Sequence, residues 1–207
     1  HLVLRCGAAE AAFSDPRRFG GAVLRRPGAG DGGDGMAGLA PDAMDEPGDP
    51  PLGGLAGRGR GVKAVLLDQG DVVSGVGNWI ADEVLYRAGI HPDQAHLTEA
   101  EVAGLAEQLR HVLATAVRCA SRGEPFPPDW IFHRRWSRRA GGKGMGKDAV
   151  TDAKGRRVSW IQSGGRSSAV VPELQKLRPR GGSGPRSKRG AGGRRMKDAA
   201  AAAAAAP

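Results

Sequence analysis

The sequence predicts an α+β fold, with a helical middle flanked by two short strand-rich segments. Three observations support this prediction. Strand-prone apolar residues surround a small turn over 1–24, apolar residues recur at helical spacing over 78–116, and a Gly-Gly pair interrupts a second strand-prone run over 158–171. The connecting segments are rich in glycine and proline, so we expect ordered units joined by loose connections.

Composition points to a nucleic-acid binder with a small core. The 207 residues include 34 glycines and 14 prolines, so a good part of the chain cannot pack. A net charge of +9 and a pI near 10.4 favour a polyanionic partner. Cys6 and Cys119 are too far apart for a cysteine zinc site or a disulfide framework, which indicates a reducing intracellular compartment rather than secretion. We expect no metal and no cofactor. We also expect no membrane partner, because no apolar run is long enough to cross a bilayer.

Residues 1–24 contain the first predicted strands. HLVLRC and AAFSD are strand-prone and are separated by a turn over 7–10. In the loop DPRRFG that follows, Arg17, Arg18 and Phe19 place two cations beside an aromatic ring. This combination suits a gap in stacked bases, where a guanidinium bonds an orphaned base and a ring acts as a wedge. A basic turn with Phe19 packed in the local core is the alternative.

A segment dominated by Gly, Pro and Asp over 27–60 predicts a flexible linker. Arg58, Arg60 and Lys63 cluster at its end, directly before the apolar run AVLLDQ. Basic residues at this place are candidate DNA contacts, and we select Lys63 as the best of the three. A solvated charge cluster without a partner is the alternative.

The central stretch over 66–92 predicts a tight turn followed by a helix. Gly75 and Gly77 directly precede Asn78, and apolar residues at helical spacing follow. A helix N-terminus carries unpaired N–H groups and partial positive charge, so Asn78 would lie at an anion-binding position. Gly89 is expected to end the helix. An ordinary helical hairpin, in which the glycines only permit close packing, is the alternative.

A second helix is predicted to begin at Thr98. Thr98 and Glu101 form a capping-box pattern, in which each side chain bonds a free backbone donor. The expected core stripe consists of Val102, Leu105, Leu109, Val112 and Ala116. The two helices together predict a helix-turn-turn-helix unit.

The last ordered region is predicted to be a β-hairpin preceded by aromatic residues. WIFHRRW over 130–136 supplies bulky apolar surface, and His133 within it is expected to be a hydrogen-bonded structural residue, because no partner ligands lie at metal spacing. Gly164-Gly165 forms the turn of the hairpin, and Arg166 follows it. A cation at this tip can reach a phosphate, while a free surface arginine is the alternative. The basic tail over 178–207 is expected to be disordered and to add salt-sensitive DNA affinity or a nuclear signal.

Four segments resemble a known family. LLDQ over 66–69 and GVGNWIADEVLYRAGIHP over 75–92 resemble the helix-two-turn-helix element of the formamidopyrimidine-DNA glycosylase and endonuclease VIII family of base-excision repair enzymes. DPRRFG over 15–20 and GGRSSAVVPELQKL over 164–177 fall in that family's order on either side. One extra residue before the GVGN turn, at Gly70-Asp71, would bring Asp71 near a phosphate path.

The resemblance implies a domain organisation. Many relatives tie the hairpin with four cysteines around zinc, but VPEL over 171–174 occupies the place of a Cys-x-x-Cys, as in the plant-type zincless branch. The implied units are the C-terminal part of an N-terminal β-sandwich (1–26), the linker (27–60), the helix-two-turn-helix domain (61–123), a zincless finger (124–177) and the tail (178–207).

The resemblance also implies a function, that of a bifunctional glycosylase and abasic-site lyase. Such an enzyme removes oxidised purines (formamidopyrimidines and oxidised guanine) and nicks the strand by β,δ-elimination. The implied partner is double-stranded DNA with oxidised bases or abasic sites, bound by a monomer in the nucleus or an organelle. Arg17 and Phe19 would be the wedge, Arg18 a phosphate contact, and Asn78 a phosphate ligand. Arg166 would grip phosphates and assist δ-elimination.

The family's N-terminal Pro-Glu and the lysine of its early domain do not occur in this sequence. We therefore expect a truncated chain that binds damaged DNA without efficient catalysis. A non-catalytic lesion or abasic-site binder is the alternative. A ribosomal-type RNA binder would fit the charge but would leave DPRRFG and the hairpin unexplained.

Overall fold

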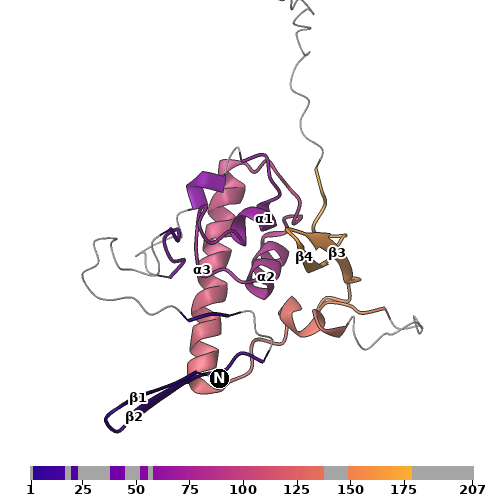
Figure 1. Cartoon of the computed structure of the whole chain (residues 1–207). Coiled ribbons are helices and arrows are strands. Elements are labelled where there is room, and N and C mark those ends of the chain that lie inside the picture. The colour runs from indigo at the N-terminus through magenta and orange to yellow at the C-terminus, as the bar shows by residue number, and fades with distance from the viewer. Residues whose placement is uncertain are drawn as a thin grey trace, which may run out of the picture.

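The computed structural model describes residues 2–16, 20–22, 38–44, 52–55, 58–137 and 149–178. A helical body forms the centre of the molecule (Figure 1). Within it, α2 (Asn78–Ala88) lies between the long helix α3 (Glu99–Arg122) on one side and the hairpin of β3 (Ser159–Ser163) and β4 (Arg166–Val170) on the other. The short helix α1 (Val62–Leu66) packs beside α2. The predicted α+β class is confirmed.

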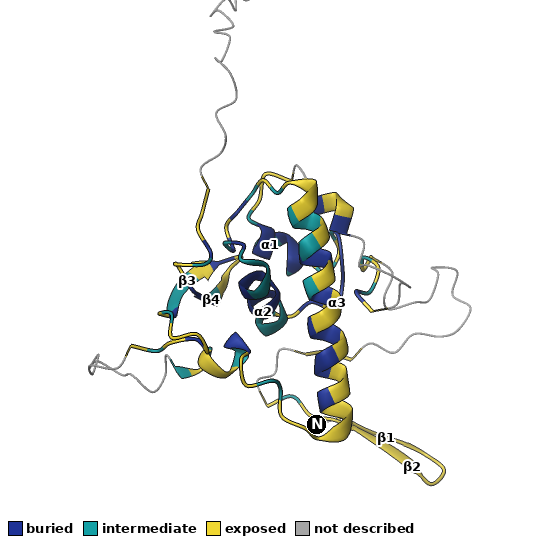
Figure 2. Cartoon of the chain, turned by 180° about the vertical axis from the view of Figure 1, so that it is seen from behind, coloured by how far each residue is buried: buried dark blue, intermediate teal, exposed yellow. Residues whose placement is uncertain are grey.

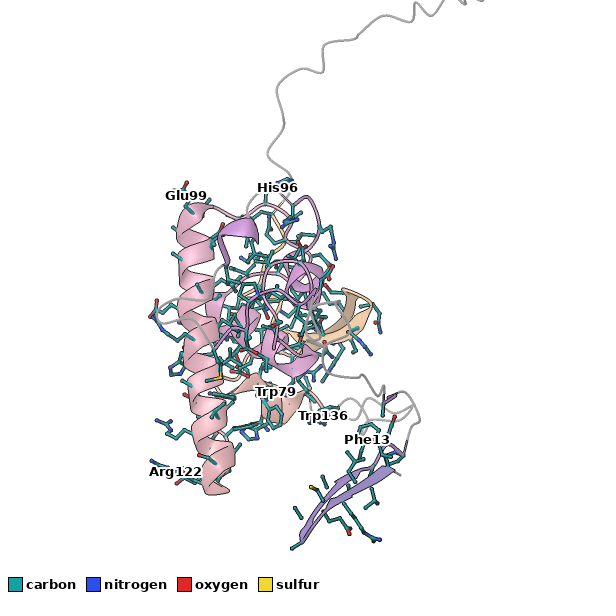
Figure 3. All side chains as sticks on the ribbon, turned by 60° about the vertical axis from the view of Figure 1, so that its left-hand side comes forward. Phe13, Trp79, His96, Glu99, Arg122 and Trp136 are labelled. Carbon is teal, nitrogen blue, oxygen red and sulfur yellow. The ribbon has the colours of Figure 1, made fainter. Side chains whose placement is uncertain are left out.

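A second hairpin projects away from this body. β1 (Leu2–Cys6) pairs with β2 (Ala9–Phe13) in antiparallel register, so the predicted strands are confirmed, with a turn shorter than expected. Every residue of both strands is exposed (Figure 2). Figure 3 places Phe13 on this projecting hairpin and Trp79 within the helical body.

The boundaries of α2 and α3 follow the capping residues of the sequence. Gly77 is the N-cap of α2, and Gly89 ends the helix in the left-handed conformation. The main-chain nitrogen of Glu101 donates to Thr98 Oγ1 over 3.3 Å, and that of Thr98 donates to Glu101 Oε2 over 2.8 Å, so the predicted capping box is present. The core stripe of α3 is confirmed as well, although its first residue is only half-buried. Its buried members are Leu105, Leu109, Val112 and Ala116.

Replacing Thr98 by alanine is expected to lower the free energy of unfolding by about 1 kcal/mol, because the N–H of Glu101 loses its acceptor. Thermal denaturation would measure the change. Ser121→Ala near the other end of α3 is the control, since its exposed hydroxyl only donates to the carbonyl of Arg118. Equal losses in the two variants would argue against a capping role for Thr98.

The linker prediction is wrong for part of 27–60. Leu52 and Leu55, in the 3-10 turn η1 (Leu52–Leu55), are buried in the helical core together with Ala43. Asp42 and Ser74 form a parallel bridge, and the nitrogen of Ala43 donates to the carbonyl of Ser74 over 3.2 Å. Two leucines three residues apart are enough to attach this glycine-rich stretch to α3. Residues 27–37 and 45–51 lie outside the described residues.

The segment after α3 joins two clusters of apolar side chains. Trp130 is buried in the helical core, near Trp79 and Phe126, whose rings stack 5.3 Å apart. Ile131, the first residue of the 3-10 turn η2 (Ile131–Arg134), instead belongs to a smaller cluster under the β3–β4 hairpin. His133 Nε2 lies 3.0 Å from the carbonyl oxygen of Pro127, which confirms a hydrogen-bonded structural histidine. None of the helices in the described part of the chain could cross a bilayer.

Candidate nucleic-acid interface

A groove of about 600 Å³ lies where α1, the start of α2 and the tip of the β3–β4 hairpin meet. Its lining includes Ala64 of α1, Asn78 of α2, and Gly164 and Arg166 of the hairpin. Asn78 and Arg166, which are far apart in the sequence, therefore lie at one site.

The turn before α2 forms one wall of this groove. Gly75 has a φ of 84°, which a side-chain-bearing residue rarely adopts, and its N–H donates to Gln69 Oε1 over 2.9 Å. Gln69 Nε2 donates in turn to the carbonyl of Val76 over 3.1 Å. The Gln69 side chain thus braces the turn that presents Asn78. Sequence reasoning used Gln69 only as part of the LLDQ motif and gave it no role.

The start of α2 offers backbone donors to the groove. The first intrahelical bond runs from the nitrogen of Ala81 to the carbonyl of Gly77, so the N–H groups of the preceding turn have no partner within the helix. The Asn78 side chain donates through Nδ2 to the carbonyl of Ser167 over 3.2 Å, while its Oδ1 is buried without a partner among the described residues. Asn78 therefore touches the hairpin as well as lining the groove.

The hairpin tip forms the opposite wall. Gly164 has a φ of 58°, and a Cβ at this position would lie 3.1 Å from the Cα of Ala64. Only glycine permits this approach of the hairpin to α1. Arg166 is exposed, and it forms no ion pair or side-chain hydrogen bond with the described residues. Its guanidinium is therefore available to an anion in the groove.

Lys63 does not lie on this surface, so its selection as the best DNA contact is wrong for this structure. Its side chain is 0% exposed, and Nζ lies 2.7 Å from Asp82 Oδ1 and donates to the hydroxyl of Ser168. The sequence cluster suggested a shared exposed position, but helix α1 turns Lys63 inward. Burial lowers the pKa of Lys63, and the neighbouring Asp82 carboxylate opposes this shift.

The exposed members of the same cluster pair with nearby carboxylates. Arg58 Nη2 lies 2.8 Å from Asp71 Oδ1, and Arg60 Nη1 lies 3.2 Å from Asp68 Oδ2. Asp71, in the lengthened connection before the GVGN turn, is thus neutralised by arginines. Asp68 lines the groove, where its pairing with Arg60 offsets its repulsion of an anion.

Arg17, Arg18 and Phe19, predicted to form the wedge and a phosphate contact, lie outside the described residues. The two ends of their loop are described, and the N–H of Gly20 donates to Asp15 Oδ2 over 2.5 Å. In the described part of the chain, no three His, Cys, Asp or Glu side chains are grouped to hold a metal ion.

Comparisons with known proteins identify the family. A family model described as the formamidopyrimidine-DNA glycosylase H2TH domain matches residues 39–125. The chain is also similar to the crystal structure of the MutM (Fpg) protein of Thermus thermophilus, with a TM-score of 0.63 and 31% identity, over 86% of this chain and 68% of that one. The chain belongs to the formamidopyrimidine-DNA glycosylase family. The family model begins before the predicted boundary at 61, in agreement with the burial of Ala43, Leu52 and Leu55 in the helical core.

Two further members of the formamidopyrimidine-DNA glycosylase family are matched over only part of their own length. The Arabidopsis thaliana formamidopyrimidine-DNA glycosylase is 40% identical over 173 residues, which make up 81% of this chain but 41% of that relative. The chain thus spans less than half the length of this relative. A structure of Lactococcus lactis formamidopyrimidine-DNA glycosylase, bound to DNA containing an abasic site, shares the fold at a TM-score of 0.50 and 24% identity, over 67% of this chain and 50% of that one.

Proposed function

We propose that this chain binds damaged double-stranded DNA as part of base-excision repair inside the cell. The observation that carries the proposal is the groove in which the start of α2 faces the same space as Arg166, whose guanidinium is exposed and has no ion-pair partner among the described residues. A DNA phosphate would receive hydrogen bonds from the free backbone N–H groups and a charge-assisted pair from Arg166. Such contacts position a strand without reading its sequence.

For the whole protein we propose the activity of a glycosylase and abasic-site lyase that removes oxidised purines. In this mechanism an N-terminal proline amine attacks the sugar carbon, the base departs, and the resulting Schiff base permits β- and then δ-elimination. Arg166 would hold the phosphates beside the lesion and assist the second elimination. Arg17 and Phe19 would fill the gap left by the flipped nucleotide, with Arg18 on a phosphate. This chain, taken alone, would hold DNA without cutting it efficiently; a non-catalytic lesion binder remains the alternative function.

We further propose that the β3–β4 hairpin is a zincless finger of the plant type. Protein groups hold its base: Asp152 Oδ2 accepts from the Tyr86 hydroxyl over 2.9 Å and from Arg156 Nε over 2.8 Å, and Oδ1 accepts from the nitrogen of Lys154 over 2.9 Å. Burial opposes ionisation of the Asp152 carboxylate, but these hydrogen bonds together outweigh burial and lower the pKa of Asp152. The 40% identity to the Arabidopsis relative agrees with this assignment.

The variants Asn78→Ala and Arg166→Ala are each expected to weaken binding to abasic-site duplex about tenfold or more, the effect of losing one charge-assisted contact. Removal of residues 179–207 should weaken it less, because tail contacts are salt-screened. Gel-shift titration at fixed salt measures all three. Arg118→Ala, on the exposed face of α3, is the matched control. Equal losses from the site variants and the tail deletion would contradict the assignment.

Borohydride trapping on the same duplex separates binding from chemistry. The reagent captures a covalent Schiff base only if an amine of the chain attacks the sugar. Binding without trapping is the expected result. A trapped complex would show that an amine of this chain performs the attack, and the proposal of inefficient catalysis would then be wrong.

A further inference from the structure

A buried cluster of three charged side chains lies behind the groove, between α1, α2 and the β3–β4 hairpin. The side chains of Lys63 and Asp82 are 0% exposed and that of Arg135 is 8% exposed. Asp82 Oδ1 pairs with Lys63 Nζ at 2.7 Å, and Asp82 Oδ2 pairs with Arg135 Nε at 2.7 Å. Asp82 Oδ2 also accepts from the nitrogen of Ala169 in β4, over 3.1 Å. One carboxylate of α2 therefore binds α1, the turn after η2 and the hairpin.

The carbonyl oxygen of Ser167 receives donors from α1, from α2 and from the turn after η2. Lys63 Nζ lies 3.4 Å from this oxygen, Asn78 Nδ2 lies 3.2 Å from it, and Arg135 Nη2 lies 3.3 Å from it. Ser167 directly follows Arg166. The main chain next to Arg166 is thus held by side chains of α1, of α2 and of the segment after η2.

The chemistry of Arg135 explains how this arrangement fixes an orientation. A guanidinium is a rigid planar fork, and here one arm binds the Asp82 carboxylate while the other binds the Ser167 carbonyl. A buried ion cluster is often no more stabilising than a well-packed apolar one, so stability alone does not account for it. The fork instead sets the distance and rotation of β4 relative to α2.

We propose that Asp82 and Arg135 are positioning residues, which lock the hairpin onto the start of α2 so that Arg166 and Asn78 face one phosphate. The inference rests on the proposed function, because it assigns a role to residues that hold the proposed phosphate contacts in place. It adds two residues to the DNA-binding apparatus that would not touch DNA themselves.

A double-mutant cycle between Arg135 and Arg166 tests this role. Arg135→Gln leaves the Lys63–Asp82 pair intact but removes both arms of the fork. It is expected to reduce affinity for abasic-site duplex about as much as Arg166→Ala, about tenfold. The double variant should bind no more weakly than Arg166→Ala alone. Once the Arg166 side chain is removed, a change in its position can no longer reduce the affinity. Independent, multiplying losses would overturn the proposal.

A second measurement without DNA keeps the two proposals distinguishable. Arg135→Gln is expected to accelerate hydrogen exchange at the amide of Ala169, which donates to Asp82, while the amides of α3 remain protected. Unchanged exchange at Ala169 would overturn the positioning role. If Arg166→Ala does not weaken binding, the proposed phosphate site fails, whatever the exchange result shows.

Two further variants complete the test. Arg87→Gln is the matched control, because Arg87 of α2 donates to Gln108 and pairs with Glu83 and Asp129, away from the hairpin tip. This variant should bind DNA normally. Arg135→Lys keeps the charge but not the fork, so it should recover only part of the affinity lost by Arg135→Gln. Full recovery would show that charge alone suffices and would contradict positioning by the fork. If Arg135→Gln does not fold, Arg135→Lys replaces it in the double-mutant cycle with Arg166→Ala.

Discussion

Replacing Asp82 by alanine is expected to lower the free energy of unfolding by about 3–5 kcal/mol, a large fraction of the stability of a small domain. The substitution leaves Lys63 and Arg135 buried close together without the carboxylate that pairs with both of them. It also removes the acceptor of the main-chain N–H of Ala169, a residue that is only 2% exposed. Urea denaturation followed by circular dichroism would measure the change.

The control for this prediction is another carboxylate that pairs with an arginine of α2. Asp129 lies 3.6 Å from Arg87, but its side chain is 61% exposed. Water screens such a pair, so Asp129→Ala should change the free energy of unfolding by less than about 1 kcal/mol. Similar losses in the two variants would show that burial of the Asp82 cluster carries no special weight.

Stability is expected to fall as the pH rises from about 4 to about 7, because of Glu83. This side chain of α2 is fully buried, and its Oε2 accepts from the nitrogen of Phe132 over 3.0 Å. Its Oε1 has no hydrogen-bond partner among the described residues and lies 4.0 Å from Arg87 Nη1. Burial raises the pKa of Glu83 from 4.5 to about 7, against the opposing effect of the Phe132 N–H. The folded protein therefore keeps a proton that the unfolded chain releases. Stability is full below the unfolded pKa and declines until the pH passes the folded one.

The variant Glu83→Gln removes this titration. At about 1.4 kcal/mol per pKa unit, the decline of the parent protein should amount to roughly 3 kcal/mol. The stability of the variant minus that of the parent should therefore rise by about that much between pH 4 and pH 8. Urea titrations across this pH range measure the slope. Glu107→Gln, on the exposed side of α3, should leave the slope unchanged. Parallel curves for the parent protein and Glu83→Gln would rule out Glu83 as the source of the pH dependence.

The helices were predictable because their boundaries depend on local signals. Gly77, Gly89 and the pair Thr98–Glu101 fix both ends of α2 and the start of α3 through contacts within a few residues, and the structure has all of them. The turn at Gly164-Gly165 is equally local. At these helix ends and at this turn, neighbouring residues in the sequence are sufficient to determine the local structure.

The burial of Lys63 was not predictable in this way. Its partners Asp82 and Ser168 come from α2 and β4, and no pattern around Lys63 indicates them. A basic cluster at a linker end has the same composition whether its members face water or a buried carboxylate. Leu52 and Leu55 show the same limit, since two leucines in a glycine-rich stretch give no periodicity.

Some residues of the candidate site were likewise predictable from the sequence, and others were not. Asn78 and Arg166 follow from turn chemistry and family resemblance, and the structure places both on one groove. Gln69 acts by accepting a hydrogen bond from the main chain of the folded turn at Gly75, and Arg135 acts by donating to Ser167 in β4. Neither role could be assigned from the spacing of residues in the sequence. Arg17 and Phe19 stay predictions.

The approach of Gly164 to Ala64 has a consequence for the shape of the groove. The Gly164 position lies against main-chain atoms of α1, where a Cβ would be 3.1 Å from one and 3.2 Å from another. At this point the spacing between the two walls is set by backbone thickness, and no rotamer change can alter it. The closest approach of the two walls is therefore a rigid dimension of the fold, set by main-chain contact rather than by side-chain conformation.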